Sequence, residues 1–146
     1  YEVRIGCSCR SIVEAAGGFV SEPFDLISGG PLMGKAMPSL DVPVLKTTSS
    51  ILALNEEEAQ DYESSNCIRC GRCAAVCPSR VLPMKLVKCT DRNDYQGFEE
   101  QNGLECCECG CCSYVCPARI KLTPSFAKAR KVIQLKKNRM KNKKKN

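Results

Sequence analysis

Thirteen of the 146 residues are cysteines, and eight of them fall into two runs with the same spacing. The first run reads Cys67-Ile-Arg-Cys70-Gly-Arg-Cys73-Ala-Ala-Val-Cys77-Pro78. The second reads Cys106-Cys-Glu-Cys109-Gly-Cys-Cys112-Ser-Tyr-Val-Cys116-Pro117. Both are C-x2-C-x2-C-x3-C-P, the spacing of thiolate ligands in bacterial proteins that bind two [4Fe–4S] clusters. The sequence therefore predicts two such clusters.

The spacing also predicts which cysteine binds which cluster. Three cysteines, each separated by two residues, let a tight loop hold three corners of one cluster, while the fourth reaches the neighbouring cluster. The proline then ends the loop by fixing φ and removing a hydrogen-bond donor. The expected ligands of the first cluster are Cys67, Cys70, Cys73 and Cys116. The expected ligands of the second cluster are Cys106, Cys109, Cys112 and Cys77.

Other uses of cysteine fit this pattern less well. Disulfides are disfavoured because the cysteine count is odd, no secretory signal is visible and the cysteines lie in tight runs. Structural zinc is also disfavoured. It commonly uses two Cys pairs separated by a dozen or more residues, whereas each run here has three cysteines followed closely by a fourth. Five cysteines remain and are expected to be incidental free thiols: Cys7, Cys9, Cys89, Cys107 and Cys111. Cys107 and Cys111 lie inside the second run, so either could act as an off-register ligand of a damaged cluster.

Charge is distributed unevenly along the chain. Residues 121–146 contain eleven Lys or Arg and no acid, whereas the whole chain has a net charge of +6. We interpret this end as solvated and disordered from Lys136 onward; the alternative is attachment to an anionic membrane or an acidic partner. Nucleic acid is not expected, because Phe126 is the single aromatic residue here that could stack on bases. No run of 18 apolar residues occurs, so no transmembrane segment is expected.

Hydrophobic patterns divide the chain into three stretches. Residues 1–55 are expected to form a small α+β unit, with strands at 2–5, 24–28, 42–45 and 51–54. A short helix is expected at 11–16, capped by Ser11 and stopped by Gly17 and Gly18. Because Tyr1 is not a start residue and the first strand has no earlier partner, the chain resembles an excerpt from a longer domain.

The other two stretches are predicted to be helical. Residues 56–122 contain the cysteine runs, and Asn55 with Glu58 has the pattern of a capping box. Apolar residues between the runs have helical spacing: Leu82, Leu86 and Cys89. Residues 123–146 begin with Thr123 as an N-cap, and an apolar stripe follows on one helix face: Phe126, Ala129 and Ile133.

One glycine-rich segment imitates a phosphate-binding loop. Gly29-Gly-Pro-Leu-Met-Gly34-Lys35-Ala36 nearly fits G-x4-G-K-[ST], but Ala36 lacks the hydroxyl that would bind magnesium. Pro31 also removes one backbone donor, and Pro38 would interrupt the helix that must follow. We therefore interpret the segment as a turn between strands and not as a nucleotide site.

Several segments together resemble the C-terminal part of the RnfC family, whose members belong to Rnf electron transport complexes. They are Gly29-Gly-Pro-Leu-Met-Gly-Lys-Ala, Leu40-Asp-Val-Pro-Val, Cys67-Ile-Arg-Cys-Gly-Arg-Cys, Val81-Leu-Pro-Met and Glu108-Cys-Gly-Cys-Cys-Ser-Tyr-Val-Cys-Pro-Ala. The resemblance implies an α+β chain: a partial β-grasp unit of the soluble-ligand-binding type, then a mainly helical dicluster ferredoxin-type domain.

The resemblance also implies a function. Members of the family relay electrons within an ion-translocating ferredoxin:NAD oxidoreductase complex, as peripheral subunits on the cytoplasmic face of the plasma membrane. Their FMN and NADH sites lie in an N-terminal region outside these segments, so this chain is not expected to be catalytic alone. The alternatives are an electron-transfer subunit of another flavin-linked reductase, similar to a cobalamin reductase, and a scaffold whose clusters are structural.

Overall fold

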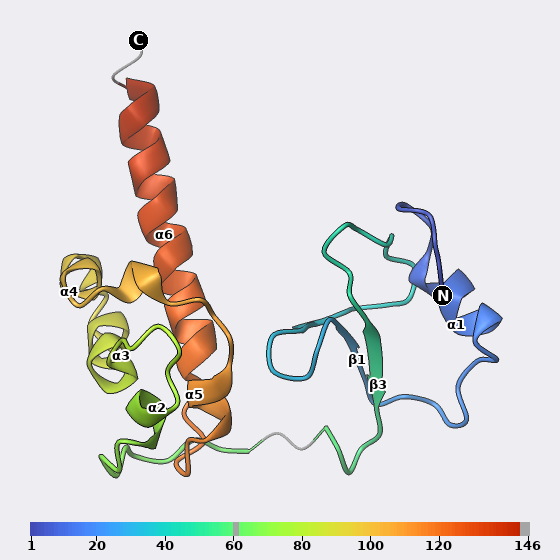
Figure 1. Cartoon of the computed structure of the whole chain (residues 1–146), viewed down its shortest axis with the longest axis horizontal. Coiled ribbons are helices and arrows are strands. Elements are labelled where there is room, and N and C mark those ends of the chain that lie inside the picture. Colours follow the sequence, from blue (N-terminus) through green and yellow to red (C-terminus); the bar gives the residue numbers. More distant parts are fainter. Residues whose placement is uncertain (60–61, 144–146) are drawn as a thin grey trace. The chain divides into compact units, whose positions relative to one another are not determined.

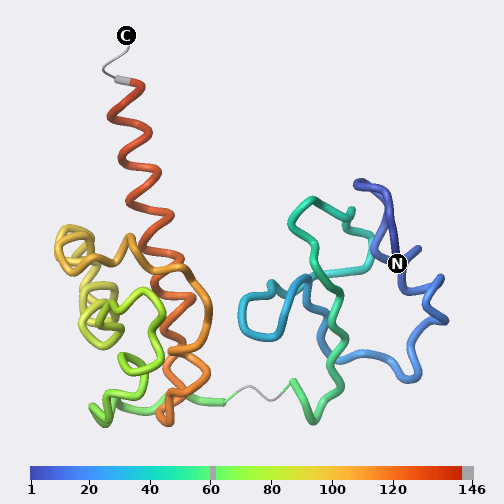
Figure 2. The backbone as a smooth tube through the Cα atoms, in the orientation of Figure 1, coloured from blue at the N-terminus to red at the C-terminus, as the bar shows by residue number. Residues whose placement is uncertain are grey.

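The structure is a computed structural model that describes residues 1–59 and 62–143. It divides the chain into two compact units, Tyr1–Tyr62 and Glu63–Asn146, which can be followed in Figures 1 and 2. The division falls slightly after the expected boundary at residue 55, and the last helix belongs to the second unit instead of forming a stretch of its own.

The first unit contains one short helix and a small antiparallel sheet. Its elements are α1 (Cys9–Ala15), β1 (Asp25–Ser28), β2 (Lys35–Ala36) and β3 (Ile51–Leu54). The strand order is β2-β1-β3, with Ile27 opposite both Ala36 and Leu52. The strands expected near 24–28 and 51–54 are therefore confirmed, whereas β2 was not predicted because it is only two residues long.

Two expected strands are absent from the first unit. Residues 2–5 are exposed and form no strand. The segment 42–45 makes only an isolated bridge between Ser8 and Pro43, in which the Val44 N–H donates to the Cys7 carbonyl and the Cys9 N–H donates to the Val42 carbonyl. The helix also begins earlier than expected, because the cap is the Ser8 hydroxyl, which accepts from the N–H of Arg10, and not Ser11. Its end at Gly17 and Gly18, both with positive φ, is as predicted.

The glycine-rich segment forms the turn between β1 and β2. Gly29 has a φ of 105°, and a Cβ on Gly34 would overlap the Ile27 side chain and the Gly30 carbonyl. These glycines are thus explained by a tight hairpin, and the residues after Gly34 form a strand and not the helix that a phosphate-binding loop requires. The prediction of a turn is confirmed.

The end of the first unit has the predicted capping pattern without a helix. The N–H of Glu58 donates to the Asn55 side chain at 2.9 Å, and the Asn55 N–H donates to the Glu58 carboxylate at 3.1 Å. This reciprocal pair is the geometry of a capping box, yet residues 56–58 form only a turn. The cap satisfies donors at the turn, but no apolar face follows to stabilise a longer helix.

The second unit is helical, as expected. Its elements are α2 (Arg72–Ala75), α3 (Pro83–Asp91), α4 (Tyr95–Glu100), the 3-10 helix η1 (Gly103–Glu105), α5 (Cys111–Tyr114) and α6 (Leu122–Lys143). Helices α3, α4 and α5 and the turn η1 all contact α6, so the long helix supports the rest of the unit (Figure 1). The core therefore lies between α6 and the shorter helices.

The apolar stripe of α6 supplies three of the eight buried residues of this core. Phe126, Ala129 and Ile133 are each at most 4% exposed, as the helical spacing predicts. Phe126 packs against Phe98 of α4, with ring centroids 6.1 Å apart and planes tilted by 51°. Gly103 passes so close to the Phe98 ring that a Cβ there would overlap it. The remaining buried members of the core are Val81, Leu86, Cys112 and Leu122.

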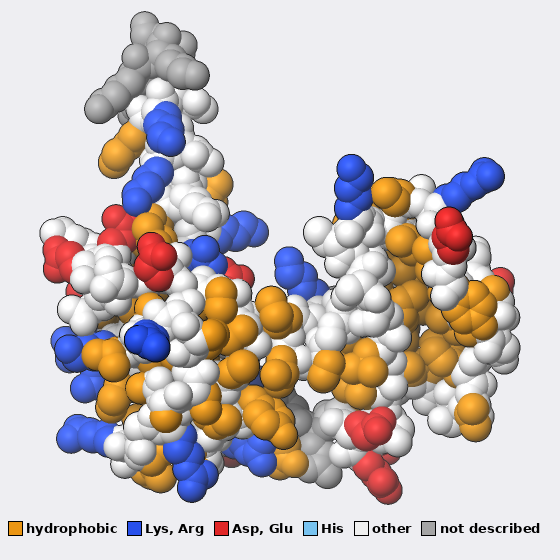
Figure 3. All heavy atoms as spheres, in the orientation of Figure 1, with side chains coloured by type: hydrophobic (Ala, Val, Ile, Leu, Met, Phe, Trp, Pro, Cys, Tyr) orange, Lys and Arg blue, Asp and Glu red, His pale blue; other side chains and the backbone are white. Residues whose placement is uncertain are grey.

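The prediction of disorder from Lys136 onward is wrong for residues 136–143, which continue α6; residues 144–146 lie outside the described residues. Six of these eight residues are Lys, Arg or Met, which favour helices. Lys137 pairs with Glu99 at 2.9 Å, and the Lys136 ammonium lies 4.8 Å from the Tyr95 ring centroid. Beyond these contacts α6 extends past the rest of the unit (Figure 2) and carries basic side chains (Figure 3).

Candidate metal centres

The two cysteine runs fold into two copies of one local structure. In each copy a glycine with positive φ, Gly71 or Gly110, precedes a four-residue helix, α2 or α5. The residue before the second cysteine is also left-handed, with φ of 57° at Arg69 and 56° at Glu108. Non-glycine residues seldom adopt this conformation, and those that do cluster at functional sites. Both runs therefore wind into the same tight loop.

The fourth cysteine of each run is fixed at the end of its short helix. Cys77 and Cys116 each donate their N–H to the carbonyl three residues earlier, at 3.3 Å. Each then accepts from the N–H three residues later, Arg80 or Arg119, at 3.1 Å. These successive turns separate the fourth cysteine from the loop that carries the other three.

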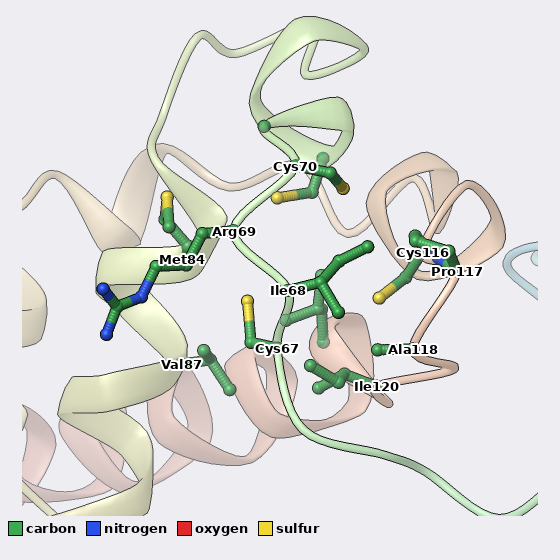
Figure 4. A pocket seen from close by; sticks show the side chains of 13 residues that line it. Cys67, Ile68, Arg69, Cys70, Met84, Val87, Cys116, Pro117, Ala118 and Ile120 are labelled. Carbon is green, nitrogen blue, oxygen red and sulfur yellow. The ribbon is translucent and has the colours of Figure 1, made fainter.

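A hollow lies beside the first loop. The four cysteines that line it are Cys67, Cys70, Cys73 and Cys116. Figure 4 shows Cys67 and Cys116 directed into the same space from different segments of the chain. Apolar side chains, among them Met84 and Val87 of α3, form much of the remaining wall. Three cysteines of one run and the last of the other thus surround one apolar space.

A second hollow lies beside the second loop. Its wall contains Cys106, Cys109 and Cys112, together with Cys77 from the first run and the additional Cys107. Phe126 of α6 closes the side toward the core. The structure therefore brings together the same two groups of four cysteines that the spacing predicts, and adds a fifth thiol to the second group.

The cysteines surround space and do not converge on a point. Four zinc ligands would each place a sulfur about 2.3 Å from one ion. Among residues 1–59 and 62–143, no three Cys, Asp or Glu side chains are grouped closely enough to hold a single metal ion. Thiols spread around a hollow instead fit a multinuclear cluster, whose separate iron atoms each need one thiolate.

Burial keeps several of these thiols protonated in the absence of metal. It raises the pKa of the Cys73 and Cys106 thiols. At Cys109 the backbone N–H of Cys111 acts to lower the pKa, but burial and hydrogen bonds with the thiols of Cys111 and Cys107 outweigh it, and the pKa is about 11. Because iron binds thiolates, cluster assembly must release these protons and is favoured as pH rises.

Hydroxyl groups distinguish the second site from the first. The Thr123 hydroxyl lies 3.6 Å from the Cys112 sulfur, and it is hydrogen-bonded at 3.0 Å to the Ser113 hydroxyl. The corresponding residues beside the first loop are Ala74 and Met84, which carry no hydroxyl. Hydrogen bonds to ligand sulfurs are among the factors that set cluster potentials. The two sites therefore differ in a feature that tunes electron affinity.

A second difference is the ion pair between Glu108 and Arg130, which joins the second loop to α6. Only 23% of the Arg130 side chain is exposed, and its Nε is buried with no hydrogen-bond partner in the described part of the chain. Its charge acts to lower the pKa of the Cys106 thiol, against the larger effect of burial. Arg130 thus neutralises an acid of the loop and favours negative charge on the sulfur beside it.

Sequence reasoning missed Arg130 as a site residue and identified Thr123 only as a helix cap, which is wrong because α6 begins at Leu122 and Thr123 lies in its first turn. Both lie on α6, outside the cysteine runs, and no spacing rule marks them. Among the remaining cysteines, Cys9 is buried in the first unit and Cys89 packs against the core of the second. Cys111 is the first residue of α5 and does not belong to the wall of the second hollow.

Residues 58–120 match the family described as "4Fe-4S dicluster domain". The match covers both cysteine runs and the helices between them, α2 to α5. It agrees with the two thiol-lined hollows, each with its own loop. Residues 58–120 are therefore similar to domains that bind two [4Fe–4S] clusters.

Longer similarities extend beyond this domain. The chain is 42% identical over 104 residues to the C subunit of the Na(+)-translocating ferredoxin:NAD(+) oxidoreductase complex of Acetobacterium woodii, covering 71% of this chain and 24% of the relative. It is 45% identical over 102 residues to the C subunit of the proton-translocating ferredoxin:NAD(+) oxidoreductase complex of Clostridium ljungdahlii, covering 70% and 22%. A third relative, the C subunit of the ion-translocating oxidoreductase complex of Rhodobacter capsulatus, is 40% identical over 95 residues, covering 65% and 18%.

These relatives confirm the resemblance to the RnfC family that the sequence segments indicated. The matched segments span at most 24% of the length of these three relatives. Within residues 1–59 and 62–143, no helix combines the length and apolar character needed to cross a bilayer.

Proposed function

We propose that this chain relays electrons through two [4Fe–4S] clusters within a membrane-associated ion-translocating ferredoxin:NAD oxidoreductase complex. The observation that carries the proposal is the crossed arrangement of thiols, in which each hollow has three cysteines of one run and the fourth of the other. Such wiring keeps two clusters close together, as one-electron transfer between them requires. The names of the relatives supply the proposed complex.

The proposed ligands of the first cluster are Cys67, Cys70, Cys73 and Cys116, and those of the second are Cys106, Cys109, Cys112 and Cys77. The clusters supply the redox chemistry, while the chain supplies thiolates, a dry apolar wall and local charge. No acid, base or nucleophile is needed for such a relay. The proposed partners are the other subunits of the complex, with the chain bound peripherally at the cytoplasmic face of the plasma membrane.

The first unit has a separate proposed role. Its antiparallel sheet of order β2-β1-β3 and single helix are compatible with part of a β-grasp domain of the soluble-ligand-binding type. We infer that residues 1–55 belong to such a domain.

Anaerobic reconstitution tests the relay directly. The full chain should bind about eight iron and about eight sulfide, because each [4Fe–4S] cluster contains four of each. Both clusters should be reduced and reoxidised reversibly in a potentiometric titration followed by electron paramagnetic resonance. A folded chain that saturates near four iron, or clusters that cannot be reduced without loss of iron, would contradict the proposed relay.

Removal of the Arg130 charge should lower the midpoint potential of the second cluster. Reduction adds negative charge, which a nearby cation stabilises, and Arg130→Gln also leaves Glu108 without its partner. The expected decrease is on the order of tens of millivolts once solvent and salt screen the charge. The matched control is Lys128→Gln, an exposed cation on the same helix, which should leave both midpoints unchanged. An equal shift in both variants would show that net charge, and not the position of Arg130, sets the potential.

Truncation before Lys136 should leave the iron content unchanged. The truncation removes the Lys137–Glu99 pair, whose side chains are 52% and 34% exposed, and the contact of Lys136 with the Tyr95 ring, so the stability cost should be about 1–2 kcal/mol. The same truncation should weaken binding to anionic vesicles in low salt, because basic residues near a membrane surface each contribute about 1 kcal/mol. Iron analysis and vesicle sedimentation measure the two effects. If the truncated protein sediments with the vesicles as well as the full chain does, the basic end does not attach the protein to the membrane.

A further inference from the structure

The wall of the second hollow contains five thiols, although a [4Fe–4S] cluster needs four. The additional thiol belongs to Cys107, which lies directly between two proposed ligands in the chain, after Cys106 and before Glu108 and Cys109. The equivalent position of the first loop is Ile68, which lines the first hollow with an apolar side chain (Figure 4). The excess of thiols is therefore specific to the second site.

Cys107 lies next to one ligand in particular. Cys107 lines the second hollow together with Cys109 and Ser79. Cys111 is the other thiol neighbour of Cys109, but it does not line the hollow. Of the two neighbours of Cys109, only Cys107 thus faces the space where the cluster would lie.

We propose that Cys107 is a reserve ligand of the second cluster, able to replace Cys109 on the same iron. This inference rests on the proposed two-cluster function. In the exchange the Cys107 thiol releases its proton to solvent and binds iron, while the Cys109 sulfur leaves the iron and takes up a proton. The charge and oxidation state of the cluster do not change, so no external oxidant or reductant is required.

Loss of Cys109 provides the test, with the first loop as an internal control. Cys109→Ala should retain about eight iron per chain, whereas the equivalent Cys70→Ala should retain about four. Adding Cys107→Ala to Cys109→Ala should lower the iron content to about four. Adding Cys111→Ala instead should leave it at about eight. The proposal is overturned if Cys109→Ala loses four iron while Cys107 is present, or if the Cys107→Ala, Cys109→Ala double variant retains all eight.

Alkylation of the loaded protein gives a readout that does not depend on iron content. Cys107 is exposed, so iodoacetamide should modify it in the wild-type holoprotein. In Cys109→Ala it should become protected, as peptide mass spectrometry can measure; continued modification of Cys107 in that variant contradicts ligation. Wild-type protein with only four iron would instead refute the two-cluster function itself, so the two failures are distinguishable.

A reserve ligand can also be engineered in the first loop. This experiment does not use Cys109→Ala, so a folding defect of that variant cannot affect the result. Because Ile68 occupies the position of Cys107 and lines the first hollow, Ile68→Cys combined with Cys70→Ala should raise the iron content from about four to about eight. Failure of this variant to regain iron would show that a thiol at this position cannot replace the second cysteine of the loop.

Discussion

Replacing Cys77 with alanine should remove the second cluster and leave the first intact. The iron content should fall from about eight to about four atoms per chain. The reason is that Cys77 lies in the wall of the second hollow, although it belongs to the first cysteine run. Cys116→Ala should have the opposite result, because Cys116 lines the first hollow.

The identity of the lost cluster can be determined without assigning spectra in advance. In Cys77→Ala, iodoacetamide should modify the thiols of the second run, while Cys67, Cys70 and Cys73 remain protected. The paramagnetic resonance spectrum of reduced Cys77→Ala should match that of Cys106→Ala and differ from that of Cys67→Ala. If Cys77→Ala instead exposes the cysteines of its own run, each run would bind one cluster alone and the crossed wiring would be wrong.

The cysteine grouping could be predicted from sequence because the loop geometry is local. Gly71 and Gly110 supply the positive φ that each tight turn needs, and the three residues that precede Cys77 or Cys116 move the last thiol past a short helix. The stripe containing Phe126 was predictable for a similar reason, since a helical repeat is visible within a few residues.

The first unit was less predictable because its strands depend on partners distant in the chain. The segment around Pro43 has strand-like composition and is hydrogen-bonded to residues 6–9, but the pairing is so short that only an isolated bridge forms. Conversely, β2 is too short to show a pattern, and pairing of Ala36 with Ile27 creates it. The Arg130–Glu108 pair could not be predicted for the same reason, because it joins α6 to a loop that is distant in the sequence.

Replacing either core phenylalanine with alanine should destabilise the second unit by about 3–5 kcal/mol. Phe98 and Phe126 are both 0% exposed, and their rings are in contact, so Phe→Ala at either position leaves a cavity in the same core. For a domain of this size, such a loss should lower the apparent melting temperature of the holoprotein by more than about 10 °C. Thermal unfolding followed by circular dichroism measures this effect.

The two phenylalanines should differ in their effect on the clusters. Phe126 lines the second hollow, whereas Phe98 packs behind it against Gly103 and is not part of that wall. Phe126→Ala should therefore admit water and chelator to the second cluster and speed the loss of four iron several-fold. Phe98→Ala serves as the matched control for general destabilisation. Equal rates of iron release from both variants would show that cluster retention follows the stability of the unit as a whole, and that the Phe126 ring does not specifically shield the second cluster.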